Sequence, residues 1–256
     1  MIDLHSHILP GVDDGARNFK EALAIATIAS EKGITKMVAT PHFRGQELTR
    51  KNIEKKIENL QLKIEQQGLE VEILPGAEVY ISSDLGRKVE EKKVPTINNS
   101  RYLLVEFPFR EIPAFVPDIF YDLRVMDYYP IIAHPERYDP VISSTSNLYE
   151  LVKKDYVYAQ INAGSLRGDF GSRIQKTAIK LIKMDLIHFI GSDVHSSSHR
   201  GQFLAQGMEF LADIDRKYVT RYQENVQRVI ADQRLEVPPP QKEKKKTLWS
   251  QIKTIF

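Results

Sequence analysis

The 256-residue chain contains no cysteine, which excludes disulfide bonds, thiolate metal ligands and every mechanism that uses a cysteine nucleophile. Any bound metal ion must therefore be held by nitrogen and oxygen donors. Histidine and carboxylate donors suit Mn, Fe, Zn or Mg. The seven histidines of the chain are consequently the first residues to place.

The chain also has no long apolar run and little net charge. No stretch approaches the roughly 20 apolar residues that cross a bilayer, and the start does not resemble a secretory signal, so we expect a cytoplasmic protein. A net charge of +2 provides no broad basic field, and we expect no nucleic-acid partner. The oligomeric state stays open at this point.

The chain alternates between segments typical of strands and of helices. Strands are predicted at residues 2–5, 34–40, 71–76, 101–107, 130–134, 158–162 and 187–193. Helices are predicted at 18–32, 49–68, 84–92, 113–127, 146–154, 172–185, 202–212 and 216–232. This alternation implies parallel strands joined by right-handed crossovers. A single (β/α) barrel is the economical interpretation, and a doubly wound open sheet is the alternative.

Ionisable side chains gather where the predicted strands end. Five of the seven histidines follow a predicted strand, and carboxylates follow others. In a barrel, the carboxyl ends of the strands meet at the face that carries the active site. We therefore predict one shared metal site. Its candidate ligands are His5, His7, Asp14, His42, Glu78, Glu106, His134, Asp193 and His195.

The first motif, MIDLHSHILPGVDDG, is weak evidence for a metal site when taken alone. Together with the histidines and carboxylates that follow the later strands, it becomes strong evidence. Residues i and i+2 of an extended segment face the same side, so His5 and His7 can reach one ion. Of the two aspartates, we favour Asp14 as a ligand. Asp13 is expected to support a ligand or to cap a turn.

Two arginines follow candidate ligands. Arg137 lies in AHPERY and Arg200 in SSSHRGQ, and the planar guanidinium fork of arginine matches phosphate oxygens. The pair predicts an anionic group on the substrate. By contrast, we expect His188 to be structural, His199 to be solvated, and Asn162 to hydrogen-bond to nearby groups.

The stretch EFPFREIPAFVP carries Phe107, Phe109 and Phe115 beside Glu106. Two interpretations remain open from the sequence. The three rings either pack in the core or form an aromatic rim that receives a ring-bearing substrate.

A run of three prolines at 238–240 ends the alternation, so we expect one catalytic barrel at 1–235 and a Pro-rich linker with a basic amphipathic tail at 236–256. Lysines 242, 244, 245 and 246 precede an apolar face of Leu248, Ile252, Ile255 and Phe256, with Trp249 beside it. This pattern suits a peripheral contact of 242–256 with an anionic membrane or with a partner groove. A solvated tail, or a helix docked on its own domain, is the equal alternative.

Six motifs in order, MIDLHSHILPGVDDG, ATPHF, PGAEV, RYLLVEFPF, PIIAHPERY and HFIGSDVH, resemble the polymerase-and-histidinol-phosphatase (PHP) superfamily. More closely, they resemble the manganese-dependent protein-tyrosine phosphatases of Gram-positive capsule and exopolysaccharide loci. The resemblance runs from Met1 to about residue 232.

The resemblance implies a distorted, TIM-like (β/α)7 barrel that holds three divalent ions, with Mn expected first. By motif position, one ion is held by His5, His7, Glu78 and Asp193. A second is held by Asp14, His42 and His195, and a third by Glu78, Glu106 and His134. Arg137 and Arg200 match the phosphate-contacting arginines of the family.

The function implied is hydrolysis of phosphotyrosine in proteins by metal-activated hydroxide. The implied substrate is a membrane-associated bacterial tyrosine kinase that controls capsule or exopolysaccharide synthesis, which places the enzyme at the inner face of the membrane. A small-molecule phosphoesterase, such as a histidinol-phosphatase-like enzyme, is one alternative. A non-catalytic binding protein that keeps the metal site for stability is another.

Overall fold

The computed structural model describes residues 1–45, 48–198, 201 and 203–243. Its strands are β1 (Ile2–Ser6), β2 (Lys36–Ala39), β3 (His42–Phe43), β4 (Glu72–Pro75), β5 (Glu78–Tyr80), β6 (Tyr102–Glu106), β7 (Tyr129–Ala133), β8 (Tyr158–Asn162) and β9 (Phe189–Gly191). Its α-helices are α1 (Phe19–Glu31), α2 (Arg50–Gln66), α3 (Leu85–Glu90), α4 (Val116–Val125), α5 (Asp139–Ser143), α6 (Ser146–Val152), α7 (Ala163–Arg167), α8 (Ser172–Lys183), α9 (Leu204–Ile214) and α10 (Arg216–Ile230). Two 3₁₀ turns, Ile97–Asn99 and Pro135–Arg137, complete the set.

The strands form two parallel sheets, with the orders β1-β2-β4 and β3-β5-β6-β7-β8-β9. All seven predicted strands are present, and two short strands that were not predicted, β3 and β5, follow the second and the third. A break at Thr40 and Pro41 separates β2 from β3, because proline has no N–H for the ladder. A second break at Gly76 and Ala77 separates β4 from β5, and a Cβ atom at Gly76 would lie 2.7 Å from Val38 Cγ1. Each break carries the chain from one sheet to the other.

The sequence predicted a closed barrel, and no sheet closes among the described residues. The end of β1 approaches the segment after β9 through one parallel bridge, between Ser6 and Val194. Two hydrogen bonds accompany it, from His7 N to the Val194 carbonyl at 2.9 Å and from Asp193 N to the His5 carbonyl at 2.9 Å. This contact is too short to be a continuous strand ladder. The predicted α/β fold with parallel strands is therefore confirmed, and the predicted closure into a barrel is not.

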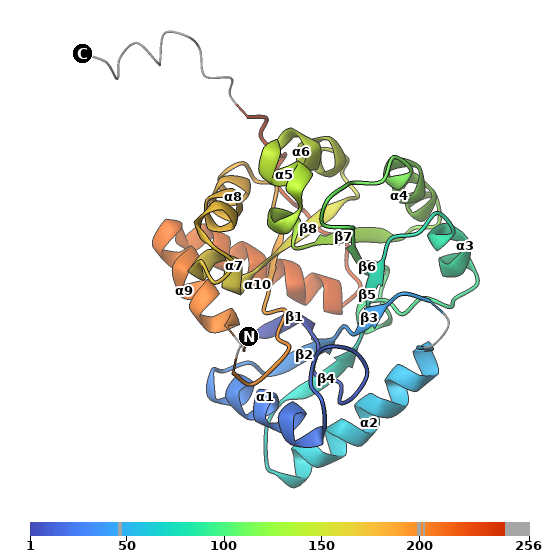
Figure 1. Ribbon diagram of the computed structural model, residues 1–256, viewed down its shortest axis with the longest axis vertical. Helices are drawn as coiled ribbons and strands as arrows, with labels where there is room; N and C mark the ends of the chain where they lie inside the picture. The colour runs from blue at the N-terminus through green and yellow to red at the C-terminus, as the bar shows by residue number, and fades with distance from the viewer. Residues whose placement is uncertain (46–47, 199–200, 202, 244–256) are drawn as a thin grey trace.

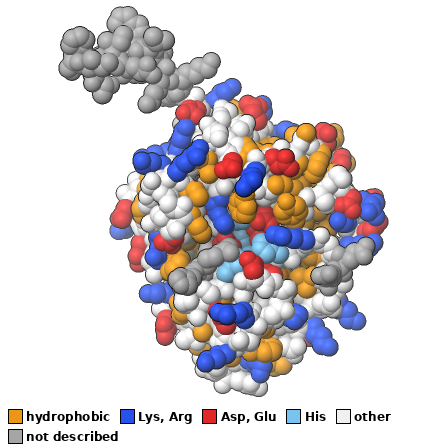
Figure 2. All heavy atoms as spheres, viewed as in Figure 1, with side chains coloured by type: hydrophobic (Ala, Val, Ile, Leu, Met, Phe, Trp, Pro, Cys, Tyr) orange, Lys and Arg blue, Asp and Glu red, His pale blue; other side chains and the backbone are white. Residues whose placement is uncertain are grey.

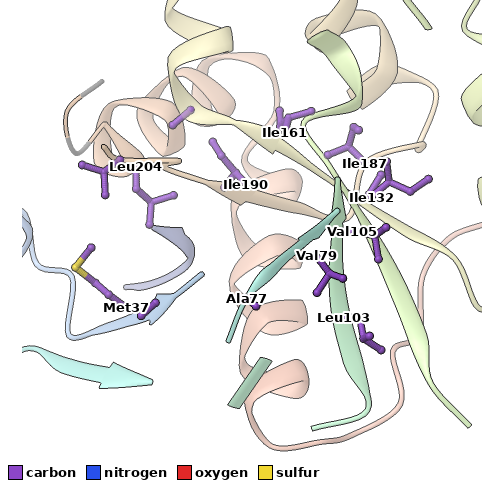
Figure 3. Close-up of a cluster of buried hydrophobic side chains, with 14 of the residues drawn as sticks. Met37, Ala77, Val79, Leu103, Val105, Ile132, Ile161, Ile187, Ile190 and Leu204 are labelled. Atoms are coloured by element: carbon purple, nitrogen blue, oxygen red, sulfur yellow. The ribbon is translucent and has the colours of Figure 1, made fainter. Parts of the chain in front are cut away.

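The strands are buried on both faces, as parallel strands covered by helices are expected to be. Helices lie outside the sheets (Figure 1), and one apolar cluster fills the space between them. Val79, Val105, Ile132 and Ile161 come to this cluster from successive strands (Figure 3). A second cluster contains the alternate strand residues together with Val226 and Val229 of α10. Apolar packing on both faces therefore fixes the strands, and with them the strand ends that carry the candidate ligands.

The larger predicted helices are present, within a few residues of their expected ends. Asn18 caps α1 by accepting a hydrogen bond from Glu21 N at 3.1 Å, and Gly33 follows the helix with a φ of 73°. The short helices α5 and α7 were not predicted. Across the described residues, no helix combines the length and the apolar character needed to span a bilayer.

Candidate metal centre

The nine predicted ligands lie together at the carboxyl ends of the strands. His5 lies in β1, His42 begins β3, Glu78 begins β5 and Glu106 ends β6. The other five lie in loops that directly follow strands: His7, Asp14, His134, Asp193 and His195. In the space-filling view, histidines lie in a hollow in the middle of this face, with basic and acidic side chains around them (Figure 2).

Glu78 is at the middle of the cluster. One of its carboxylate oxygens, Oε1, lies 2.8 Å from His134 Nε2. The other, Oε2, lies 3.0 Å from His42 Nδ1, 3.3 Å from His7 Nε2 and 3.5 Å from His5 Nε2. A single buried carboxylate thus contacts four imidazoles, two from the end of β1, one from β3 and one from the end of β7.

The other carboxylates complete three overlapping groups. Asp193 Oδ1 lies 3.4 Å from both His5 Nε2 and His7 Nε2. Asp14 Oδ1 lies 3.4 Å from His42 Nε2 and 3.3 Å from His195 Nε2. Donor atoms within 4.8 Å of one another define the groups His7, Asp14, His42 and His195; His5, His7 and Asp193; and His42, Glu78 and Glu106. Each group has the nitrogen and oxygen donors and the spacing that a divalent ion needs.

The electrostatics of the cluster favour added positive charge. Burial, and then the negative charge of Glu78, raises the pKa of Glu106 to about 7. Burial opposes charge on His7, but its hydrogen bond to Asp13 and the carboxylates of Asp193 and Glu78 outweigh burial and raise its pKa well above the usual value. Without cations the cluster therefore holds protons. Glu106 Oε2 is buried and accepts no hydrogen bond from the described residues, which also fits a site built for metal ions.

Residues outside the cluster orient its histidines. Asp13 Oδ2 accepts from His7 Nδ1 at 2.8 Å and from His42 N at 2.9 Å, so Asp13 supports a ligand as predicted. Gln160 Oε1 lies 2.8 Å from His5 Nδ1. Both contacts direct the Nε2 atoms of His5 and His7 into the cluster. Gln160 was not predicted, although YAQIN places it on the same side of a strand as Asn162.

Arg137 lies at the rim of the cluster. Its Nη1 donates to Asp193 Oδ2 at 3.1 Å, and Asn162 Nδ2 donates to the same oxygen at 2.6 Å, as expected of Asn162. The guanidinium lies 4.9 Å from the ring centroid of Phe109 and 4.7 Å from that of Phe170. These two rings hold the guanidinium plane in place. The other predicted arginine, Arg200, lies outside the described residues.

The phenylalanines of EFPFREIPAFVP were expected either to pack in the core or to form an aromatic rim, and the structure shows both arrangements. Phe107 is buried and stacks on Tyr138 with ring centroids 5.5 Å apart, and Phe115 packs against the core. Phe109 is 41% exposed, and its ring stacks on that of His134 at 5.7 Å. Phe109 therefore forms the rim, while the other two belong to the packing beneath it.

His188 is buried, and its Nδ1 accepts from Ala159 N at 3.1 Å, so it is structural as predicted. His199 lies outside the described residues. Arg44 was missed: its side chain is 64% exposed, and Nη2 lies 3.8 Å from Glu106 Oε2. Its place near the cluster could have been predicted, since Arg44 follows the candidate ligand His42 by two positions.

The backbone at the site has unusual conformations. His134 and Asp193 have φ values of 33° and 53°, in the left-handed region that non-glycine residues rarely adopt. At Gly15, a Cβ atom would lie 2.2 Å from the His7 carbonyl oxygen. The loop after β1 thus packs directly on the backbone of a candidate ligand.

Known proteins resemble this chain over nearly its full length. CapC of Staphylococcus aureus is 36% identical over 258 residues, which cover 97% of this chain and 98% of that protein. The tyrosine-protein phosphatase YwqE of Bacillus subtilis is 31% identical over 252 residues, 97% of this chain and 99% of that protein.

A solved structure agrees in fold. It comes from work on YwqE of Bacillus subtilis and CpsB of Streptococcus pneumoniae, described there as unique metal-dependent tyrosine phosphatases. It superposes with a TM-score of 0.92 at 31% identity, and the match covers 96% of this chain and all of that chain. A family model described as capsular polysaccharide synthesis, CpsB/CapC, matches residues 1–236. These matches confirm the resemblance inferred from the six motifs, and the chain belongs to the CpsB/CapC family.

Proposed function

We propose that this chain is a metal-dependent phosphatase that hydrolyses phosphotyrosine in protein substrates. The observation that carries the proposal is the convergence of nine candidate histidine and carboxylate ligands with Arg137 at their rim. The names of the relatives point to the same activity.

We further propose that the centre holds three divalent ions, with Mn the first candidate and Fe, Zn or Mg the others. His5, His7, Glu78 and Asp193 hold one ion. Asp14, His42 and His195 hold the second, and Glu78, Glu106 and His134 hold the third. The contacts of Glu78 with four imidazoles support its place in two of these ligand sets, since Glu78 would be within reach of donors from both. When bound, such ions lower the pKa of water enough to supply a nucleophile near neutral pH and neutralise charge on phosphate.

The residues of the chain bind and orient the substrate. The contact of Arg137 with Asp193 uses one of the five donors of the guanidinium, and other donors are directed to the non-bridging phosphate oxygens. Phe109 offers a ring face to the phenol ring of phosphotyrosine. Arg200 is the second proposed phosphate ligand. Because the leaving phenol has a pKa near ~10, its departure does not require a strong general acid.

The physiological substrate that we propose is a membrane-associated bacterial tyrosine kinase involved in polysaccharide synthesis. The description of the CpsB/CapC family supports the connection to capsule synthesis. We propose that residues 1–235 are the catalytic domain and that the tail brings this domain to the inner face of the membrane.

We also propose that the two sheets form one interrupted (β/α)7 barrel of the PHP type. The strand order and the bridge between Ser6 and Val194 support this view, because they put the first strand unit beside the last.

The test of the function is hydrolysis of a phosphotyrosine peptide beside a phosphoserine peptide and histidinol phosphate. Metal-stripped protein is assayed before and after manganese is added back. Manganese-dependent turnover that favours the phosphotyrosine peptide is expected. Preference for histidinol phosphate would move the protein to small-molecule metabolism, and no turnover of the three by metal-loaded protein would indicate a binding protein. Iodoacetamide serves as a control and should have no effect, since the chain has no thiol.

A further inference from the structure

A groove of about 1230 Å³ opens beside the metal centre, between the loop after β1 and helix α2. It shares Asp14 and His42 with the centre, so the two are continuous. Its volume exceeds the roughly 300–1,000 Å³ of ordinary small-molecule pockets. The part contributed by α2 consists of Asn52, Lys55, Lys56 and Asn59.

These four residues form one stripe along α2. Their spacing of i, i+3, i+4 and i+7 puts them on the same face of the helix. The neighbouring stripe of Ile53, Ile57, Leu60 and Ile64 is buried and fixes the helix on the core. The polar stripe is therefore held rigidly along one side of the groove.

Among the described residues, the α2 side of the groove is lined only by neutral and positively charged side chains. Among the described residues, no carboxylate forms an ion pair with Lys55 or Lys56, and Lys56 Nζ lies 3.5 Å from the Pro10 carbonyl oxygen. Arg44 adds a third cation at the end nearest the centre. Of the two aspartates that line the groove, Asp13 already accepts hydrogen bonds from His7, Gly15 and His42, and Asp14 belongs to the metal centre.

We infer that this groove binds an acidic segment of the substrate, close in sequence to the phosphotyrosine. This inference rests on the proposed function. It adds a preference for the amino acids that flank the phosphotyrosine in the substrate. From Asn52 to Asn59 the stripe is about 10 Å long at ~1.5 Å per residue. An extended peptide covers that length with about three residues at ~3.3 Å each. An acidic segment of about three residues therefore matches the length of the stripe.

The test compares three phosphotyrosine peptides of equal length, flanked on both sides by glutamate, glutamine or lysine. For the manganese-loaded enzyme, kcat/KM is expected to be highest with glutamate and lowest with lysine. Because the contacts are exposed charges, the preference should shrink as salt is raised. Equal kcat/KM for the three peptides would overturn the inference and leave the proposed function intact. Absence of turnover on all three would instead overturn the proposed function.

The decisive variant is Lys55→Gln with Lys56→Gln. Glutamine is a good helix former, so α2 is expected to persist. The ratio of kcat/KM between the glutamate and glutamine peptides should fall roughly two- to tenfold, as expected for two exposed charge contacts. The matched control is Lys176→Gln with Lys183→Gln on α8, which removes the same charge far from α2 (Figure 1). A ratio that falls equally in both variants, or in neither, would refute the role of the groove.

Discussion

At the scale of single residues, Glu78 joins the parts of the metal centre. Its two oxygens contact four imidazoles that come from three strands. Glu78→Gln keeps the shape of the side chain and removes the charge. We expect the variant to bind fewer metal ions per chain and to lose at least roughly a hundredfold in turnover, since even residues behind metal ligands often contribute that much. Metal analysis and phosphotyrosine-peptide assays measure the two effects.

Glu72→Gln is the matched control for this substitution. Glu72 lies on β4 and pairs with Lys36 on the surface, at 2.5 Å. The same chemical change there should leave metal content and turnover at the level of the unaltered protein. If Glu78→Gln retained its full metal content, the assignment of Glu78 as a bridge would be wrong.

Replacing Arg137 with lysine tests the planar geometry of the guanidinium group separately from its positive charge. Lysine at this position keeps the positive charge but has no planar fork to lie between Phe109 and Phe170. Arg137→Lys is expected to lower kcat roughly ten- to a hundredfold while metal content is unchanged. An equal loss of metal would show that Arg137 acts by holding Asp193 and does not contact phosphate.

The proximity of the candidate ligands could be predicted from the sequence because they follow strands and lie in short motifs. The structure brings eight of them into the three groups and puts His134 Nε2 2.8 Å from Glu78 Oε1. Gln160 could not be assigned in the same way, because its partner His5 lies 155 positions earlier and only the folded sheet brings them together. Arg44 was missed because a single arginine after a histidine has many ordinary explanations.

At the scale of elements, the loop after β1 depends on close contact between Gly15 and His7. A Cβ at Gly15 would lie 2.2 Å from the His7 carbonyl oxygen, so Gly15→Ala must displace this loop. We expect loss of bound metal and of activity. Gly86→Ala in α3 is the control, since its Cβ would meet Asp122 Cβ at an ordinary 3.6 Å. It should stabilise the protein by about 0.4–1 kcal/mol in chemical unfolding. Normal metal binding by Gly15→Ala would contradict this account.

The segment before β9 gives a prediction about pH. Burial, and then the charge of Arg221, lowers the pKa of His188 to about 3. In the unfolded chain its pKa is about 6.5. As the pH falls from about 6.5 toward 3, only the unfolded chain gains this proton, so stability present above pH 6.5 is progressively lost. Urea unfolding of metal-stripped protein at pH 7.5 and pH 5 measures the loss, and His188→Gln should reduce it. An equal loss in both proteins would contradict the assignment.

The elements themselves were largely predictable, and their connections less so. Long periodic segments such as α2 and α8 were found because an amphipathic period is visible over three or more turns. The helices α5 and α7 have five residues each, too few to show that period. The strands β3 and β5 were not predicted, because they have two and three residues and are recognised only by their pairing with a neighbouring strand. The hydrophobic pattern of each segment also could not show that, among the described residues, the strands do not close into a continuous barrel.

At the scale of the whole molecule, the described chain ends in contact with the body of the protein. Gln241 N donates to the Met184 carbonyl at 2.7 Å, and Glu243 accepts from Thr145 Oγ1 at 2.8 Å. Removing residues 244–256 should therefore leave the fold and peptide hydrolysis unchanged. Binding to vesicles that contain anionic lipid should weaken roughly a thousandfold, since each of the four lysines removed contributes about 1 kcal/mol.

Neutral vesicles are the control for this deletion, because they should bind neither form appreciably. Unchanged binding of the shortened protein to anionic vesicles would exclude the tail as a membrane contact. A partner groove would then be the remaining role for its basic and apolar residues.

The arrangement of the strands has a consequence for how the protein is made. Ser192 Oγ donates to Asp3, a contact that joins residues 189 positions apart, and the histidines of β1 lie beside Asp193. At ~5–20 residues per second, a ribosome adds the last strand roughly 10–40 s after the first. Until then the early histidines have no complete set of partners. Loading with metal is therefore a late event in the life of the chain, and an interrupted translation product would carry the first motif without a working centre.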